Sequence, residues 1–284
     1  MRALTRTHSP VADARPVPLE WKSALMLTVL SVAGLGMFAW PLFIPAESAS
    51  AETTSSPFVF ILLLPLLIFL VLAQISEKGM DAKALAVLGV LSAINAALRP
   101  LGAGTNGVET VFFLLVLAGR VFGPGFGFVL GCTSLFASAL LTAGVGPWMP
   151  FQMLASAWVG MGAGFLPDSV FGRRIRGKAE IVMLIMYAIL AGYFFGAIMN
   201  LWFWPFVTGP AMGADAAIAY IPGGPLIDNL TRYGWFTLIT STAVWDTGRA
   251  ITNTVLLILV GSPVLAALRR TVSRAVFNPQ VTFN

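Results

Sequence analysis

The chain has 284 residues, of which 57% are hydrophobic and only 10% are charged, and its formal net charge is +5. Because an average soluble domain has about 25% charged residues, this composition excludes a soluble globular enzyme, a disordered chain and a collagen. The single cysteine, Cys132, excludes a secreted domain held together by disulfide bonds. It indicates an integral membrane protein, in which a basic excess is expected to report topology rather than nucleic-acid binding.

Eight apolar segments approach the length of about 20 residues that a helix needs to cross a bilayer. They predict an all-α integral membrane protein with eight transmembrane helices. The fourth segment is the shortest, because Arg120 and the sequence Gly123-Pro124-Gly125 end it early. In chain order the segments are Ser23–Ile44, Pro57–Ile75, Ala84–Leu98, Thr110–Gly119, Phe126–Ala143, Phe151–Leu166, Ile181–Trp204 and Gly234–Val260.

The positions of lysine and arginine test this count independently, because short cytoplasmic loops collect basic residues. With the N-terminus in the cytoplasm, eight spans leave all but three of the 17 basic residues on the inner side. Arg99 and Arg232 fall in outer loops, and Arg249 falls within the last span. The pattern therefore predicts a multi-pass membrane protein with both termini in the cytoplasm.

The polar stretch Ser76–Lys83 divides the chain into two unlike parts. The two spans before it carry almost no polar residues at depth, whereas the later spans are rich in Gly, Ala, Asn, Gln and Trp. Polar residues within spans mark helices that enclose a site. We therefore expect a cytoplasmic tail at 1–22, an accessory transmembrane hairpin and linker at 23–83, a six-helix substrate-binding core at 84–260 and a cytoplasmic tail at 261–284.

The sequence holds no recognisable catalytic or ATP-binding motif. The single histidine, His8, lies in the polar N-terminal tail, so a His-Glu-x-x-His zinc site cannot form, and there is no Gly-x-x-x-x-Gly-Lys-Ser/Thr phosphate-binding loop. We expect a protein that is not an enzyme, holds no metal and needs no cofactor. If it drives transport, the energy comes from an ion gradient or from another subunit.

Polar and aromatic residues gather in three predicted outer loops, Arg99–Glu109, Gly144–Gln152 and Pro205–Tyr233, and at the span ends beside them. Their convergence on one side predicts a pocket open to the outside, with aromatic walls and a few polar groups, as small-molecule sites have. Individually, these residues also fit an interfacial aromatic belt, snorkelling arginines or ties between helices. The candidate substrate-binding residues of these clusters are Arg99, Asn106, Glu109, Trp148, Phe151, Gln152, Asn200, Trp204, Asp228, Asn229 and Arg232.

Asp246 and Arg249 lie one turn apart near the middle of the last predicted span. An isolated charge at that depth costs about 2.5–3.5 kcal/mol on an insertion scale, and the i,i+3 spacing lets the two neutralise each other. One interpretation is an internal ion pair that holds the bundle together. The other is a ligand contact at the floor of the pocket or a coupling element, so both residues are candidate substrate-binding residues.

Small residues form a stripe on the third predicted span, where Ala82, Ala86, Ala93 and Ala97 include two Ala-x-x-x-Ala pairs. Such pairs let another helix approach closely. The partner helix is either within this chain or in another membrane subunit.

The stretch Ala84–Pro167 resembles the substrate-binding S components of energy-coupling factor (ECF) transporters. The resemblance is carried by Ala93–Ala97, the loop Arg99–Glu109, the run Glu109–Gly127 and the sequence Trp148–Gln152. It implies a subunit of the bacterial plasma membrane that captures a vitamin or a metal ion outside. The subunit then docks on a transmembrane coupling subunit, whose two ATPase subunits drive it to topple and release its load inside.

The same resemblance implies that Ala86, Ala93 and Ala97 face the coupling subunit and that the three outer polar clusters hold the substrate. The sequence lacks the Met-His signature of nickel and cobalt members, so an organic vitamin is expected, and the wide outer loops look like those of cobalamin-type members. The hairpin at 23–75 is additional to the usual six spans. We therefore expect a vitamin-like substrate, a coupling subunit, ATPases and the lipid bilayer as partners, and no nucleic acid.

Two other classes stay open on the sequence alone. One is an ion-gradient-coupled secondary transporter in which Asp246 and Arg249 form the relay. The other is an intramembrane enzyme or a non-catalytic membrane scaffold. The missing catalytic histidine argues against the enzyme, whereas a scaffold leaves no sequence signature.

Overall fold

The computed structural model of the chain describes residues 19, 21–43, 80, 82–102, 105, 107–209 and 212–276. The predicted span Pro57–Ile75 and the candidate site residue Asn106 lie outside these residues. The described part is built almost entirely from helices, because a backbone in lipid has to satisfy its own N–H and C=O groups.

The helices of the described part follow one another along the chain. In chain order they are α1 (Trp21–Phe38), α3 (Ala82–Leu98), α4 (Val111–Phe122), α5 (Pro124–Leu141), α6 (Met149–Phe165), α7 (Lys178–Thr208), α8 (Leu226–Thr237), a π-helical segment (Leu238–Asp246) and α9 (Thr247–Val276). Short 3-10 turns occupy Trp40–Leu42 and Arg99–Gly102. Between α6 and α7, β1 (Ser169–Val170) and β2 (Arg173–Arg174) pair antiparallel, with Ser169 opposite Arg174.

Five helical stretches of the described part are long and apolar enough to cross a membrane, which supports a multi-pass protein but does not confirm eight spans. Each predicted span that falls within the described residues contains a helix. The fourth is short, as expected: α4 has 12 residues, and all of them are buried, so neighbouring helices shield it from lipid. The last is longer than predicted, because α8, the π-helical segment and α9 form one continuous apolar stretch, Leu226–Ser273.

Helices α4, α5 and α6 form the tightly packed centre of the molecule. Their contacts depend on glycine: a Cβ atom at Gly119 or Gly127 would overlap the carbonyl oxygen of Gly160, and one at Gly160 would overlap that of Gly127. Gly131 is packed in the same way against the backbone of Ala157. Small residues at such positions let helix backbones approach closely.

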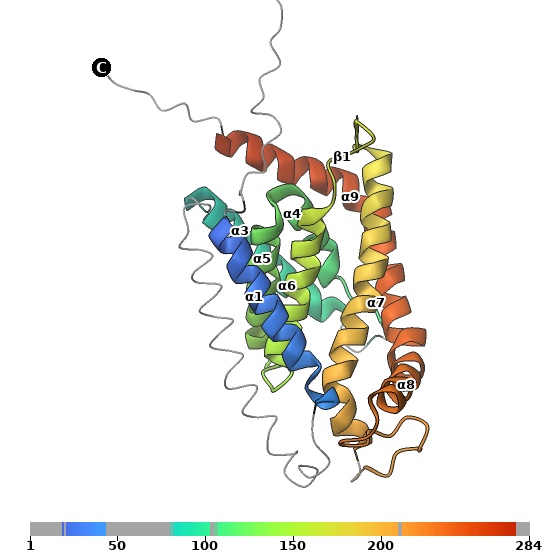
Figure 1. Cartoon of the computed structure of the whole chain (residues 1–284). Helices are drawn as coiled ribbons and strands as arrows, with labels where there is room; N and C mark the ends of the chain where they lie inside the picture. The colour runs from blue at the N-terminus through green and yellow to red at the C-terminus, as the bar shows by residue number, and fades with distance from the viewer. Residues whose placement is uncertain are drawn as a thin grey trace, which may run out of the picture.

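Helix α1 leans against α6 and α7 on one side of this centre (Figure 1). The Trp158 indole donates to Ser31 Oγ at 3.0 Å, and the rings of Phe38 and Phe151 meet edge to face with centroids 5.1 Å apart. Gly34 gives room to the side chain of Leu154. The described helix of the predicted hairpin is thus packed against the rest of the bundle.

Helices α7 and α9 run beside each other, and the C-terminal part of α9 turns across one end of the bundle, over α4 (Figure 1). Pro263 inside α9 removes a backbone hydrogen bond and permits such a bend. Leu265 and Leu268 are buried beyond it, so this segment packs as a helix up to Val276.

The two ends of the bundle differ in charge. We call one the basic end, defined by Arg120, Arg173, Arg174, Arg176 and Arg269. The opposite end, where α7 finishes and the chain continues into α8, is called the loop end.

Candidate functional site

A cavity of about 590 Å³ opens toward the loop end, between the start of α6, the second half of α7, α8 and the π-helical segment. Its walls combine aromatic and aliphatic side chains with hydroxyl, amide and guanidinium groups. This volume lies within the range of about 300–1,000 Å³ that is typical of small-molecule sites. Three of the sequence-predicted residues line it: Gln152, Asn200 and Arg249.

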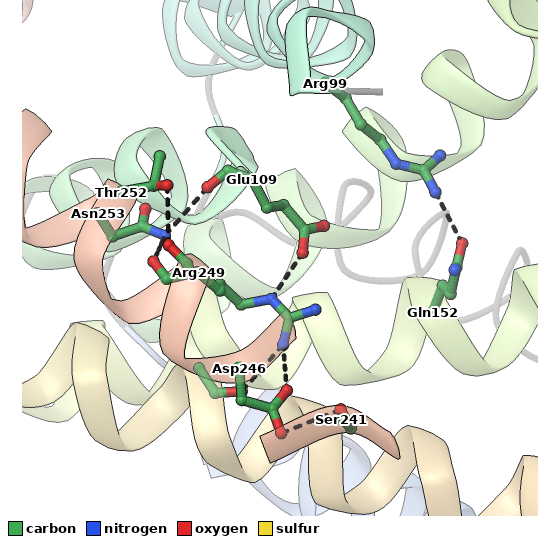
Figure 2. A network of polar contacts seen from close by, with 10 residues as sticks. Arg99, Glu109, Gln152, Ser241, Asp246, Arg249, Thr252 and Asn253 are labelled. Atoms are coloured by element: carbon green, nitrogen blue, oxygen red, sulfur yellow. Dashed lines mark hydrogen bonds and ion pairs between the residues drawn. The ribbon is translucent and has the colours of Figure 1, made fainter. Parts of the chain in front are cut away.

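The guanidinium of Arg249 is the centre of a polar network at the cavity (Figure 2). Its Nε donates to Glu109 Oε2 at 2.6 Å and its Nη1 to Asp246 Oδ1 at 2.7 Å, while Nη1 also donates to the Gly192 carbonyl at 3.2 Å. Arg249 is 7% exposed and Asp246 is 1% exposed. The ion pair that the i,i+3 spacing predicted is therefore present, and Glu109 joins it from a loop 140 residues earlier in the chain.

Aromatic rings enclose the Arg249 guanidinium. Its carbon lies 5.4 Å from the centroid of the Phe112 ring and 4.9 Å from that of Phe195. A cation over an aromatic face gains about 0.5–2 kcal/mol, more when water is excluded. The rings therefore stabilise the guanidinium and fix its orientation toward the two carboxylates.

The π-helical segment shapes the same network. Ser241 Oγ donates to Asp246 Oδ2 at 3.0 Å, a contact between residues five apart, and Thr247 Oγ1 donates to the Thr242 carbonyl at 2.7 Å. The wider turn of a π-helix brings such i,i+5 positions together. Gly196 on α7 leaves the space for the carboxylate, since a Cβ there would overlap Asp246.

The first loop is held onto α9 at several points. Asn253 Nδ2 donates to the carbonyl oxygens of Glu109, at 3.1 Å, and Arg249, at 2.8 Å (Figure 2). Gly107 has φ +75°, and a Cβ atom there would crowd the backbone of Val244 and Gly248. Glycine is the residue that adopts this conformation without strain. The loop therefore carries Glu109 to Arg249 in a fixed position.

A second contact joins the first loop to α6, because Arg99 Nη2 donates to Gln152 Oε1 at 3.0 Å (Figure 2). The neighbouring candidates behave differently. Trp148 is 41% exposed, as the interfacial interpretation allows, and Phe151 is buried between the rings of Phe38 and Trp202. Neither Trp148 nor Phe151 lines the cavity.

The candidates of the third loop mainly hold that loop in place. Trp204 Nε1 donates to the Ile218 carbonyl at 2.7 Å, and Ile218 lines the cavity. Asn229 donates to the Ile221 carbonyl at 2.7 Å and accepts from its N–H at 3.3 Å. Arg232 makes a long contact of 3.5 Å to the Ala219 carbonyl, and Asp228 is exposed.

Further cavity residues were missed by the sequence reasoning: Phe195, Gly196, Met199, Phe203, Thr240, Ser241 and Trp245. On α7 a signal existed, because Phe195, Met199 and Phe203 recur at four-residue spacing beside Asn200, and residues at that spacing share a helix face. For Ser241 and Trp245 the sequence carried no such signal, because their placement depends on the π-helical turn.

A second buried ionic cluster lies at the basic end and was also not predicted. Glu180 Oε1, on a residue only 1% exposed, accepts from Arg120 Nε at 2.8 Å and from Arg269 Nη2 at 2.6 Å. Arg120 Nη1 also bonds Asp168 at 2.8 Å and the Leu166 carbonyl at 2.9 Å. The cluster therefore ties α4, the turn after α6, α7 and α9 together.

The alanine stripe of α3 faces away from the bundle. Ala86, Ala93 and Ala97 are exposed, as are Val90 and Ile94 on the same helix. The opposite side of α3 packs on α5 through two side-chain hydrogen bonds, Ser92–Thr133 at 2.7 Å and Asn95–Ser134 at 3.0 Å.

Among the described residues, no group of three or more His, Cys, Asp or Glu side chains could hold a metal ion.

The chain matches a family of known proteins. A family model described as "ECF transporter, substrate-specific component" matches residues 83–264. No curated protein and no solved structure matches the chain.

Proposed function

The chain belongs to the family of substrate-specific components of ECF transporters, and on that premise we propose that it captures a vitamin-like organic molecule in the cavity beside Arg249. The family is one of transport subunits in the bacterial plasma membrane, and it implies a transmembrane coupling subunit, ATPases and a small-molecule substrate. The apolar helices of this chain agree with a multi-pass membrane protein.

The cavity at the loop end is the observation that carries the proposal. It combines aromatic walls with a few polar groups, and the groups on its floor are fixed by the Glu109–Arg249–Asp246 network. Fixed polar groups give a binding site its specificity, while apolar walls supply most of the contact area. The same network also joins parts of the bundle. The interpretation of Asp246 and Arg249 as an internal ion pair is therefore compatible with their interpretation as a ligand contact.

The cavity volume supports a substrate smaller than cobalamin. A volume of about 590 Å³ suits a drug-sized ligand, for which pockets of about 300–1,000 Å³ are usual. A corrinoid with its nucleotide loop is much larger than such a ligand. We therefore propose a vitamin-like compound of a few rings, in place of the cobalamin-type substrate that the outer loops suggested.

The exposed face of α3 supports docking to the coupling subunit. Ala86, Ala93 and Ala97 leave a shallow surface on which another helix can pack closely. The charge distribution supports the orientation, because cytoplasmic segments collect arginine and lysine. In the proposed orientation the basic end faces the cytoplasm, the loop end faces outward, and both termini are cytoplasmic.

A two-part experiment tests this function. The purified chain in lipid nanodiscs should bind its substrate without ATP, and uptake by cells should require coexpressed coupling and ATPase subunits. Uptake by the chain alone that collapses with an uncoupler and survives ATP depletion would instead identify a gradient-coupled carrier. A chain that neither binds a small molecule nor associates with the coupling subunit would support the scaffold interpretation.

A further inference from the structure

The amide of Asn200 is an unpaired polar group in the wall of the cavity. Its Nδ2 atom is buried without a hydrogen-bond partner among the described residues, and Asn200 lines the cavity. A buried donor without a partner loses its hydration and gains nothing in return, so each such group in a folded protein needs an explanation. A ligand that accepts a hydrogen bond from this amide provides one.

A second donor of the cavity is also unused. The hydrogen bonds of Arg249 within the described part of the chain involve Nε and Nη1, whereas Nη2 makes none, and Arg249 lines the same cavity. In Figure 2 no dashed line ends on this third guanidinium nitrogen. Asn200 Nδ2 and Arg249 Nη2 are therefore two hydrogen-bond donors of the same cavity, and a matching ligand has acceptor atoms for them.

The charge of the network restricts which acceptors fit. Arg249 contributes one positive charge, while Glu109 and Asp246 together contribute two negative charges. A ligand carboxylate or phosphate placed on Nη2 would meet these carboxylates at short range, and like charges repel strongly where water is excluded. A neutral carbonyl oxygen accepts from Nη2 and Asn200 without that penalty.

The remaining walls favour a flat ring with donors of its own. The aromatic residues Phe195, Phe203 and Trp245 line the cavity, and aromatic side chains pack well against a flat ring. Thr240 and Ser241 use their hydroxyl hydrogens on Phe236 O and Asp246 Oδ2, so their oxygen lone pairs can still accept. A primary amide such as that of Asn200 can donate and accept at once along the edge of a heterocycle.

Resting on the proposed function, we propose that the ligand is a neutral, flat heterocycle with a cyclic amide edge. Its ring N–H and carbonyl pair with the side chain of Asn200, and a carbonyl oxygen accepts from Arg249 Nη2. The aromatic side chains contact the faces of the ring. This inference narrows the substrate class from any vitamin-like molecule to one recognised through a ring carbonyl and an adjacent N–H.

Matched probes test this class directly. Lumichrome is a neutral three-ring compound with a cyclic imide edge, and its fluorescence reports binding to the purified chain in nanodiscs. The same ring methylated at the imide nitrogen lacks the N–H, and 7-carboxylumichrome adds an anion to the ring. Lumichrome should bind, and each altered probe should bind more weakly by about tenfold or more, as expected for the loss of one or two hydrogen bonds or for charge repulsion.

Protein variants complete the test. Asn200→Leu keeps a similar volume and removes both amide groups, so lumichrome binding should fall about tenfold or more while the unfolding temperature is kept. Leu190→Met, on the exposed face of α7, is the matched control and should bind as the wild type does. The proposal is overturned if lumichrome does not bind, if Asn200→Leu binds it equally well, or if 7-carboxylumichrome binds as tightly.

Failure here is distinguishable from failure of the proposed function. A wild-type chain that copurifies with coexpressed coupling and ATPase subunits, but shows none of this selectivity, overturns the ligand class alone. A wild-type chain that does not assemble with them overturns the proposed function, whatever the probes show.

Discussion

The substitution Arg249→Met tests whether the Arg249 guanidinium neutralises the buried carboxylates of Glu109 and Asp246. It removes the only guanidinium that contacts Asp246 and Glu109 among the described residues and leaves the two carboxylates facing each other. Asp246 is 1% exposed, so solvent cannot replace the lost hydrogen bonds. Removing one partner of a buried ion pair costs about 3–5 kcal/mol, which corresponds to a fall of roughly 10 °C in unfolding temperature for a chain of this size.

The assay is thermal unfolding of the purified protein in one detergent, followed by size-exclusion chromatography or tryptophan fluorescence. Arg232→Met is the matched control, because within the described part of the chain the Arg232 side chain makes one long contact of 3.5 Å, to the Ala219 carbonyl. It should lower the unfolding temperature much less. Equal unfolding temperatures for the two variants would refute the view that Arg249 neutralises buried charge.

A rescue variant separates charge from packing. Asp246→Asn and Glu109→Gln, combined with Arg249→Met, remove all the charges of the network while keeping side-chain volumes similar. Because replacing a whole buried ionic cluster by neutral groups is often close to neutral in stability, the triple variant should unfold at a higher temperature than Arg249→Met alone. No recovery would mean that the hydrogen bonds and the guanidinium stacking, rather than charge balance, carry the stability.

Four further substitutions probe other parts of the fold. Gly160→Ala places a Cβ against the backbone of Gly127 and should destabilise the protein by about 1–3 kcal/mol in thermal unfolding. Gly36→Ala, with open space around it, is the control and should be neutral or slightly stabilising. Equal effects of the two substitutions would contradict the close packing of helices at Gly160. Ala93→Trp should leave ligand binding unchanged but reduce copurification with the coupling subunit, and unchanged copurification would exclude this face from docking. Glu180→Gln should lower the unfolding temperature, because it leaves buried guanidinium groups without a carboxylate, and an unchanged temperature would show that the cluster is not needed for stability.

Local sequence patterns predicted the features that depend on neighbours along one helix. The spacing of Asp246 and Arg249 was enough to predict their ion pair. The early end of the fourth span was also expected: α4 ends at Phe122, before Gly123 with φ +104° and Pro124. Arg120 lies inside this helix, and its contact with Glu180, 60 residues later, was not expected. The length of the hydrophobic segments alone could not set the number of spans. Helix α4 is too short to be recognised by its length, and neighbouring helices shield it from lipid.

The candidate site was predicted in part for the same reason. Asn200 and Gln152 are polar residues near the ends of apolar spans, so they can be recognised in the sequence as candidates. Both line the cavity. The role of Trp204 is different, because its indole holds the third loop through the Ile218 carbonyl, a contact that depends on how that loop folds back. The contact of Glu109 with Arg249 joins residues 140 positions apart, and no local pattern indicates such a pairing.

The π-helical segment gives the last span a turn that is wider than an α-helical one. A π-helix closes its hydrogen bonds between residues five apart, against four apart in an α-helix, so deleting one residue between Ser241 and Asp246 would let an ordinary α-helical turn form there. Residues four apart share a face of an α-helix, so Ser241 and Asp246 would still lie side by side after the deletion. The last span can therefore lose one residue at this point while Asp246 keeps its hydroxyl donor, but Trp245, which lines the cavity, has to stay.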